Sequence, residues 1–221
     1  MLSDLLNPKG LHGQSSAYLK LFLQDCLGMV NEFSDEQIGN FRVIYERFID
    51  AKRTIDITIE GNGRFIPIVA KIDADEQDNE CYDACTFAQS IDKQAKLVFL
   101  TLFGRACEPN SRGQLKDEDI LLISFESHIL KWLEKCLNLP GTANKPPIHV
   151  ILTQFITSMY IHYEKIKFDG EDVHLAKPED YGVYFRLLNP KNFDRVVSEA
   201  SVILLRKIQN PRVCQISKDF N

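Results

Sequence analysis

The sequence predicts an α/β protein in which a β-sheet of mixed strand direction is flanked by helices. Three observations lead to this fold class: a β-rich hairpin at residues 53–72, a helical segment at about 78–91, and two almost uninterrupted apolar runs at 96–102 and 120–124. Antiparallel strands can join through a tight turn, whereas parallel strands need a longer crossover, which is usually a helix. A hairpin, a helix and two buried strands in that order therefore predict a mixed sheet with helices packed on it.

The hairpin is predicted from the dipeptide Asn62-Gly63, a strong short-range turn signal, which separates two β-rich runs. With this dipeptide at the turn, Asp56 pairs with Val69. Side chains alternate across a strand, so Asp56 and Lys71 project to the same side of the sheet, one diagonal apart. An acid and a lysine in this arrangement could hold a divalent metal and a phosphate, or they could form an ordinary cross-strand ion pair.

The other elements are predicted from apolar periodicity and from turn residues. Ahead of the hairpin we expect a helix from Ser15 or Ser16 to about Gly28, an acidic connection at 34–37, and a strand at 41–48. After it we expect an acidic helix entrance at 73–78, helices at 125–138 and about 147–164, a short strand at 181–188 and a final amphipathic helix. The predicted domains are a core at 1–165 and a mostly helical C-terminal extension at 166–221 that packs on the core.

Composition narrows the class of protein. A chain of 221 residues with 44% hydrophobic content can bury a substantial core, and no uninterrupted apolar run is long enough to predict a membrane span. The segment Met1–Asp4 lacks the basic and apolar regions of a secretory signal, so we expect a cytoplasmic protein. The formal net charge of -5 argues against broad, non-specific nucleic-acid binding but allows a local basic groove.

The six cysteines form no CxxC pair, and without a secretion signal we expect reduced thiols. Cys81 and Cys85 stand one helical turn apart and could ligate a metal or an iron–sulfur cluster together. Zinc sites normally need four ligands, however, and no nearby Cys/His pair completes this one. The alternative interpretation is that both are small core thiols on one helix face.

Five short motifs occur in an order that matches the expected elements. They are Leu5–Pro8 with His12-Gly13, Arg53–Ile57, Lys71–Gln77, Val98–Gly104 and Ile123–Leu133. Together they resemble the PD-(D/E)XK nuclease superfamily, and most of all its bacterial PD-(D/E)XK nuclease-like proteins. The resemblance covers about residues 5–165 and implies a restriction-endonuclease-like fold: a mixed sheet with flanking helices and, here, a helical C-terminal extension.

The resemblance implies metal-dependent phosphodiester hydrolysis, with DNA as the substrate and Mg²⁺ or Mn²⁺ as the cofactor. Carried over to this sequence, Asp56 is the first metal ligand, Ala70 supplies a carbonyl ligand and Lys71 is the catalytic lysine. Gln77 matches a glutamine of the family pattern that lies close to the site. Hard Mg²⁺ takes oxygen ligands, which accounts for the carboxylate and the carbonyl.

Val69 is the main departure from the family pattern, because it stands where the family has its second acidic ligand. The glutamine and tyrosine of the next helix are also replaced, by Glu80 and Ala84. Another carboxylate could substitute for the missing one: Glu46 is the first candidate, with Asp73 and Glu80 as alternatives. Other hypotheses are an inactive nuclease-fold module that binds DNA or a protein partner, a structural subunit whose acidic surface meets a protein partner, and a valine introduced to silence a working enzyme. A homodimer is also possible.

Several polar residues have both a functional and a structural interpretation. His12 could contact phosphate, although a histidine in a tight His-Gly turn is more often structural. Gln77 could contact the site or simply begin a helix, and Asp73, Asp75 and Glu76 are expected to form a solvated first turn. The basic residues that could touch a DNA backbone, or could be scattered surface charge, are Arg105, Arg112, Lys116, Lys131 and Lys135.

Overall fold

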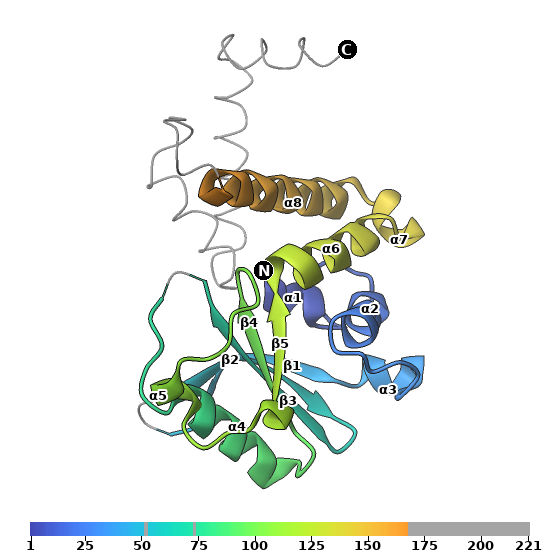
Figure 1. Cartoon of the computed structure of the whole chain (residues 1–221). Helices are drawn as coiled ribbons and strands as arrows, with labels where there is room; N and C mark the ends of the chain where they lie inside the picture. Colours follow the sequence, from blue (N-terminus) through green and yellow to red (C-terminus); the bar gives the residue numbers. More distant parts are fainter. Residues whose placement is uncertain (51–52, 73, 168–221) are drawn as a thin grey trace. The chain divides into compact units, whose positions relative to one another are not determined.

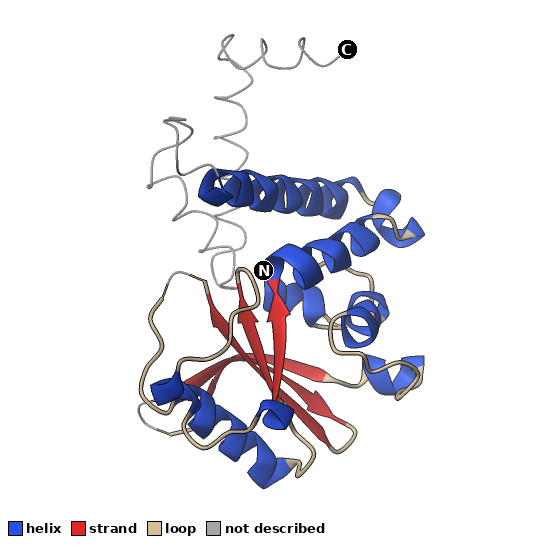
Figure 2. Cartoon of the chain, in the orientation of Figure 1, coloured by secondary structure: helices blue, strands red, loops and turns tan. Residues whose placement is uncertain are grey.

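A mixed β-sheet lies at the centre of the part of the chain that the structure describes (Figures 1 and 2). In this computed structural model the described residues are 1–50, 53–72 and 74–167, with side chains described as far as residue 160. Within them the sheet has five strands in the spatial order β1 (Arg42–Phe48), β2 (Thr54–Gly61), β3 (Arg64–Lys71), β4 (Leu97–Thr101) and β5 (Ile120–Ser124). The first three strands pair antiparallel, and β3, β4 and β5 pair parallel. The predicted mixed α/β sheet is confirmed.

The turn between β2 and β3 is the one that the sequence predicts. Gly61 pairs with Arg64, which leaves Asn62 and Gly63 as the two turn residues. Both have positive φ, 53° and 75°, as a type I′ turn requires. Glycine and asparagine adopt this backbone more readily than other residues, so the dipeptide itself sets the register of the hairpin.

Helix α4 (Glu80–Ile91) provides the crossover from β3 to β4 and packs on both strands. Its buried side chains share one apolar cluster with side chains from the strands that it covers; the cluster includes Cys81, Ala84, Cys85, Ala88, Phe65, Val69, Leu97 and Phe99. Removing this much apolar surface from water stabilises the packing of α4 on the sheet. The predicted helix at about 78–91 is confirmed, with its first residue at Glu80.

The opposite face of the sheet is covered as well. Alternate strand residues such as Ile66, Ile68 and Leu100 are also buried, and alternation directs them away from α4. On this side lie α1 (Leu2–Leu6), α2 (Ala17–Asp25) and α6 (Leu130–Leu137); α1 packs on β1 and α2 packs on α6 (Figure 1). A sheet covered on both faces explains why β3 and β4 are apolar almost throughout.

The segment predicted as one helix at 125–138 has two parts, a π-helical turn at Phe125–Ile129 followed by α6. The helix predicted at about 147–164 is confirmed as α8 (Pro146–Lys167), which packs on α6 and on the short α7 (Pro140–Ala143). Short helical segments also occur at α5 (Pro109–Arg112) and at Asp117–Asp119.

The prediction of a non-helical connection at 34–37 is wrong, because helix α3 (Asp35–Gly39) begins there. The Ser34 side chain accepts a hydrogen bond from the Gln37 backbone N–H, and the Gln37 side chain accepts one from the Ser34 N–H. This reciprocal capping box satisfies two backbone donors at the start of a helix. The acidic residues that suggested a loop are those that the first turn of a helix favours.

Residues Leu2–Lys167 form one compact unit. The predicted extension at 166–221, with its strand and final helix, lies almost wholly outside the described residues, and the domain division stays a prediction. Among the described helices, none is both long enough and apolar enough to span a membrane.

Candidate active site

The hairpin opens at the end opposite its turn, and Asp56 lies where it opens. The paired ladder of β2 and β3 stops at Ile57 and Ile68, so Asp56 and Val69, next in register, are no longer partners in it. Instead, the Ala70 backbone N–H donates to Asp56 Oδ2 at 2.7 Å. A side-chain carboxylate therefore takes a backbone donor, which holds the acid in one orientation.

Lys71, the last residue of β3, contacts a carboxylate from the following helix. Its Nζ lies 2.8 Å from Oε1 of Glu80, the first residue of α4, and donates to the Asp75 carbonyl at 3.3 Å. The Lys71 and Glu80 side chains are only 10% and 18% exposed. The Gln77 backbone N–H donates to Glu80 Oε2 at 3.0 Å and fixes the second carboxylate oxygen. The lysine thus has a well-defined partner on α4 rather than on the facing strand.

Glu46 lies on β1 at an irregular point of the sheet. Pairs form on either side of it, at Tyr45–Ile57 and Arg47–Ile55, which places Glu46 opposite Asp56 in register. Its φ of 52° is left-handed, a conformation that costs about 1–2 kcal/mol for a residue with a Cβ. Burial, a hydrogen bond with Glu46, and the charges of Glu46 and Asp56 raise the pKa of the Tyr45 hydroxyl to about 12. Tyr45 thus borders the acidic group, which its sequence context did not indicate.

Charge at this end of the hairpin favours a bound cation. Burial raises the pKa of Asp56; the Ala70 N–H and the Lys71 charge oppose that shift, and the Glu80 and Glu46 carboxylates reinforce it. Several acids therefore act on a partly buried carboxylate beside one lysine. The Glu80 and Glu46 carboxylates lie close enough to Asp56 to raise its pKa. Carboxylate oxygens suit a hard divalent ion such as Mg²⁺, which would relieve this repulsion.

Val69 supplies no ligand and has a packing role. It is 1% exposed and belongs to the apolar cluster that α4 forms with the sheet. Its register position is the one that the hairpin predicts, next to Asp56, but its side chain fills the core. The carboxylate in contact with Lys71 is that of Glu80, from α4.

The other residues that the sequence suggested for the site, Gln77, Asp73 and Glu76, differ in what they contact. Gln77 is exposed, and its described contacts are made by its backbone: the N–H donates to the Glu80 carboxylate and the carbonyl accepts from the Glu80 N–H, as expected just before a helix. Asp73 lies outside the described residues. Glu76 contradicts the expected solvated turn: it is 7% exposed and its carboxylate contacts Arg105. A buried acid needs such a partner.

His12 is structural. It is 4% exposed, its Nε2 donates to the Asn7 carbonyl at 2.8 Å, and its Nδ1 accepts the Gln14 N–H at 3.0 Å. Its ring also stacks on Tyr18 at 4.6 Å between centroids. Burial lowers the pKa of His12, with smaller and opposing effects from Asn7 and Asp4. A neutral ring with both nitrogens engaged shapes the His-Gly turn.

Most of the basic residues considered for DNA contact already have acidic partners. The pairs are Arg105 with Glu76, Arg112 with Asp117, Lys116 with Glu118 and Lys135 with Asp25. The last three pairs are accessible to solvent and contribute little to stability, so their cations can exchange partners with a phosphate at small cost. Arg105 instead pairs with the buried Glu76 carboxylate.

A family model described as the PD-(D/E)XK nuclease superfamily matches residues 1–157 of the 221-residue chain. The matched region contains Glu46, Asp56, Ala70, Lys71 and Glu80. No curated protein and no solved structure gives a significant match.

Proposed function

Because the chain belongs to the PD-(D/E)XK nuclease superfamily, we propose that it is a divalent-metal-dependent hydrolase of DNA phosphodiesters. Asp56 and Glu80 are its acidic ligands, and Lys71 is its catalytic lysine. One observation carries this assignment: the 2.8 Å contact between Lys71 Nζ and Glu80 Oε1, made beside Asp56 at the open end of the hairpin.

Glu80 replaces the acid that β3 lacks. The family pattern has an acid where this chain has Val69 and a glutamine where it has Glu80. Both positions have changed, and the second change supplies the carboxylate that the first removed. Because Glu80 contacts Lys71, which lies two positions after Val69, the exchange moves the ligand from strand to helix while keeping it close to Asp56 and Lys71.

The residues of the chain hold and orient the reacting groups. When bound, Mg²⁺ or Mn²⁺ would neutralise charge on the scissile phosphate and activate a water molecule. Ala70 keeps Asp56 in place through its N–H, and Gln77 does the same for Glu80. We expect the Ala70 carbonyl to be a further oxygen ligand, as the family pattern implies.

Lys71 acts on the substrate. In the free protein its ammonium is occupied by Glu80 and by the Asp75 carbonyl. A phosphate oxygen placed at the site would compete for the same donor, so that Lys71 stabilises the charge that develops on the phosphorus oxygens. Glu80 is thereby released to serve as a ligand.

Glu46 has a secondary role in this proposal, although the sequence ranked it first. The Glu46 carboxylate raises the pKa of Asp56 less than Glu80 does, and Glu46 is exposed to solvent. Glu46 nevertheless lies opposite Asp56 in register and has a left-handed backbone conformation. Backbone strain of this kind often accompanies functional positions. We assign it to outer contacts of the ion or of its water molecules.

An inactive module that binds DNA or a protein partner is the second candidate. Two observations favour it: Val69 is buried in the core and supplies no ligand, and Glu80 already forms an ion pair with Lys71. Such a module would bind nucleic acid with the usual salt dependence but would leave it intact.

A cleavage assay separates the two candidates. Purified protein is incubated with plasmid, single-stranded DNA and RNA in Mg²⁺ or Mn²⁺, beside the Asp56→Asn variant. The proposal expects cleavage of DNA by the wild type and none by Asp56→Asn. Binding without cleavage in either metal would support the inactive module instead.

A further inference from the structure

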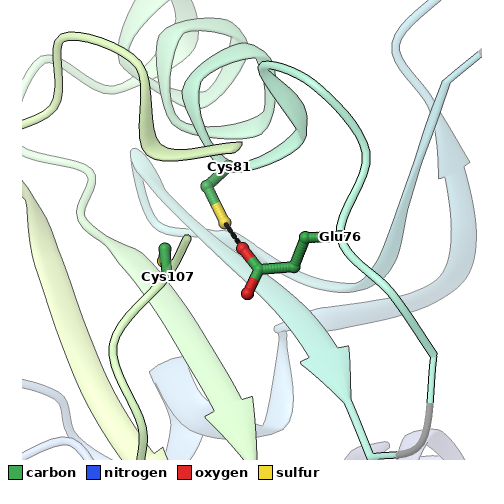
Figure 3. A group of neighbouring side chains, drawn as sticks. All are labelled: Glu76, Cys81 and Cys107. Atoms are coloured by element: carbon green, nitrogen blue, oxygen red, sulfur yellow. Dashed lines mark hydrogen bonds between the residues drawn. The ribbon is translucent and has the colours of Figure 1, made fainter. Parts of the chain in front are cut away.

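A second group of metal-type ligands lies on the other side of the start of α4. Figure 3 shows Glu76, Cys81 and Cys107 as neighbours, with the Cys81 sulfur directed at the Glu76 carboxylate. They come from three segments: the loop before α4, the first turn of α4, and the loop after β4. One ligand atom from each lies within 4.8 Å of the others, and all three residues are buried. The Cys81 Sγ lies 3.8 Å from Glu76 Oε2.

The spacing suits a tetrahedral zinc ion. Zinc binds sulfur at about 2.3 Å and carboxylate oxygen at about 2.1 Å, so two of its ligand atoms stand roughly 3.5–3.8 Å apart. The Cys81 sulfur and the Glu76 oxygen, which share a hydrogen bond at 3.8 Å, stand at the upper end of that range. Three protein ligands leave the fourth tetrahedral position to a water molecule, as in zinc sites that keep one position open.

The surrounding charges balance such an ion. Two thiolates and the Glu76 carboxylate carry three negative charges, and a divalent cation leaves one. Arg105, whose guanidinium contacts Glu76 Oε1, supplies the remaining positive charge. The Glu108 N–H also donates to Glu76 Oε2 at 3.1 Å and orients the carboxylate toward the sulfurs.

The three ligand atoms share one small buried space, within 4.8 Å of one another. Groups that all become negative on losing a proton disfavour one another unless a cation stands between them. Binding zinc would displace one proton from each thiol.

We propose that Glu76, Cys81 and Cys107 bind a zinc ion that joins the start of α4 to the loop after β4. This site is separate from the Asp56–Lys71–Glu80 group, because soft thiolates select zinc whereas an all-oxygen site selects Mg²⁺ or Mn²⁺. It differs from the Cys81–Cys85 pair that the sequence suggested: Cys85 Sγ is directed to the Asp119 carbonyl at 3.8 Å. The ion would hold in place the helix turn that carries Glu80.

The test is zinc content and cobalt absorption of the full chain, purified under reducing conditions. We expect one zinc per chain after dialysis, and a cobalt-substituted protein with thiolate-to-cobalt charge-transfer absorption. Cys81→Ser and Cys107→Ser should lose both signals. Cys85→Ser is the matched control, since Cys85 is a buried thiol on the same helix, and it should keep them.

Two further variants test the zinc site independently of the cysteine variants. Glu76→Gln keeps the side-chain size and should lower zinc affinity at least tenfold, which tests the site even if a cysteine variant does not fold. Asp56→Asn should retain its zinc in full. Absence of bound zinc and of cobalt–thiolate absorption in the reduced wild type would overturn the proposal, as would loss of zinc in Asp56→Asn with retention in Cys81→Ser and Cys107→Ser.

Discussion

Two consecutive residues at the start of α4, Glu80 and Cys81, take part in groups of opposite chemistry. Glu80 contacts Lys71 at the open end of the hairpin, among carboxylates and a lysine. Cys81 contacts Glu76 beside Cys107, among buried thiols. Successive residues of a helix point about 100° apart, so one helix start can serve two sites without sharing a ligand.

The difference between the two groups lies in burial and in ligand atoms. The Glu80 carboxylate remains partly exposed, and a long polymeric substrate needs such access. Cys81 is fully buried, and the thiols around Glu76 are closed off from solvent. We therefore expect the group around Asp56, Lys71 and Glu80 to determine cleavage, and the group around Glu76, Cys81 and Cys107 to determine stability. A separate measurement tests each expectation.

Replacement of Lys71 should have the largest effect. Lys71→Met removes the ammonium that stabilises developing charge, so we expect cleavage to fall by about 10²–10³-fold. Because the Lys71 and Glu80 side chains are only 10% and 18% exposed, loss of the ammonium leaves the Glu80 carboxylate without its partner, and we expect stability to fall by about 1–3 kcal/mol. Steady-state cleavage and urea unfolding measure the two effects. Lys20→Met, which breaks the surface pair with Asp35, is the control and should leave cleavage unchanged.

Replacement of Glu80 and of Glu46 should have the next largest effects, and the two variants should differ in how much Mg²⁺ affinity they lose. Glu80→Gln removes a proposed ligand while keeping the side-chain shape, and we expect Mg²⁺ affinity to fall by about 10–100-fold, the range seen when metal-site contacts are lost. Glu46→Gln should weaken binding by less than tenfold, because its influence on Asp56 is smaller. Calorimetric titration with Mg²⁺ compares the variants. Equal losses of Mg²⁺ affinity in the two variants would show that Glu46 is a metal ligand to the same extent as Glu80.

Removal of zinc should lower thermal stability while leaving the hairpin site formed. For a domain of this size each kcal/mol of lost binding corresponds to roughly 2–4 °C in Tm. We expect a zinc-selective chelator to lower the Tm of the wild type and of Cys85→Ser, but not that of Cys81→Ser. Fluorescence of Trp132, which is fully buried and is the single tryptophan of the chain, reports the transition. An equal fall in Cys81→Ser would show that the chelator acts elsewhere.

A pH effect at His12 should be the smallest, because it concerns stability alone. Burial lowers the folded-state pKa of His12 below 6.5, so the unfolded chain binds this proton more readily than the folded one. Stability is therefore complete above about pH 6.5 and falls as the pH drops toward the folded-state value. The nearby charges are Asp4, which opposes the shift, and Lys145, which adds to it.

Urea unfolding at pH 7.5 and pH 5.5 measures the His12 effect. His12→Gln should show a smaller difference between the two pH values than the wild type. Because burial and Lys131 also lower the pKa of His128, the comparison should be made with His128→Gln, which retains the His12 contribution. An unchanged pH difference in His12→Gln would exclude this origin.

The sequence predicted those parts of the fold that local chemistry dictates. Asn62-Gly63 fixed the turn and its register, and the apolar runs became β4 and β5 because both faces of the sheet are covered. Helix α3 was missed because acidic residues suit both loops and first helical turns. The capping pair of Ser34 and Gln37 was the local signal that could have identified it.

The site was predicted less completely, because its contacts depend on how residues 72–79 bend between β3 and α4. Asp56 and Lys71 came from the register of one hairpin, which the sequence specifies. The contact of Glu80 with Lys71, and that of Cys81 with Cys107, depends on a loop path and on a segment more than twenty residues later in the chain. Residue spacing alone carries no information on either.

An exchange of the two altered positions is the decisive test of Glu80 as the replacement ligand. Val69→Glu combined with Glu80→Gln returns the acid to β3 and the glutamine to α4, as the family pattern has them. We expect Glu80→Gln alone to lose Mg²⁺-dependent DNA cleavage and the double variant to regain a measurable part of it. Full cleavage by Glu80→Gln alone, or cleavage by the double variant in a protein whose wild type has none, would contradict the assignment of Glu80 as the replacement ligand.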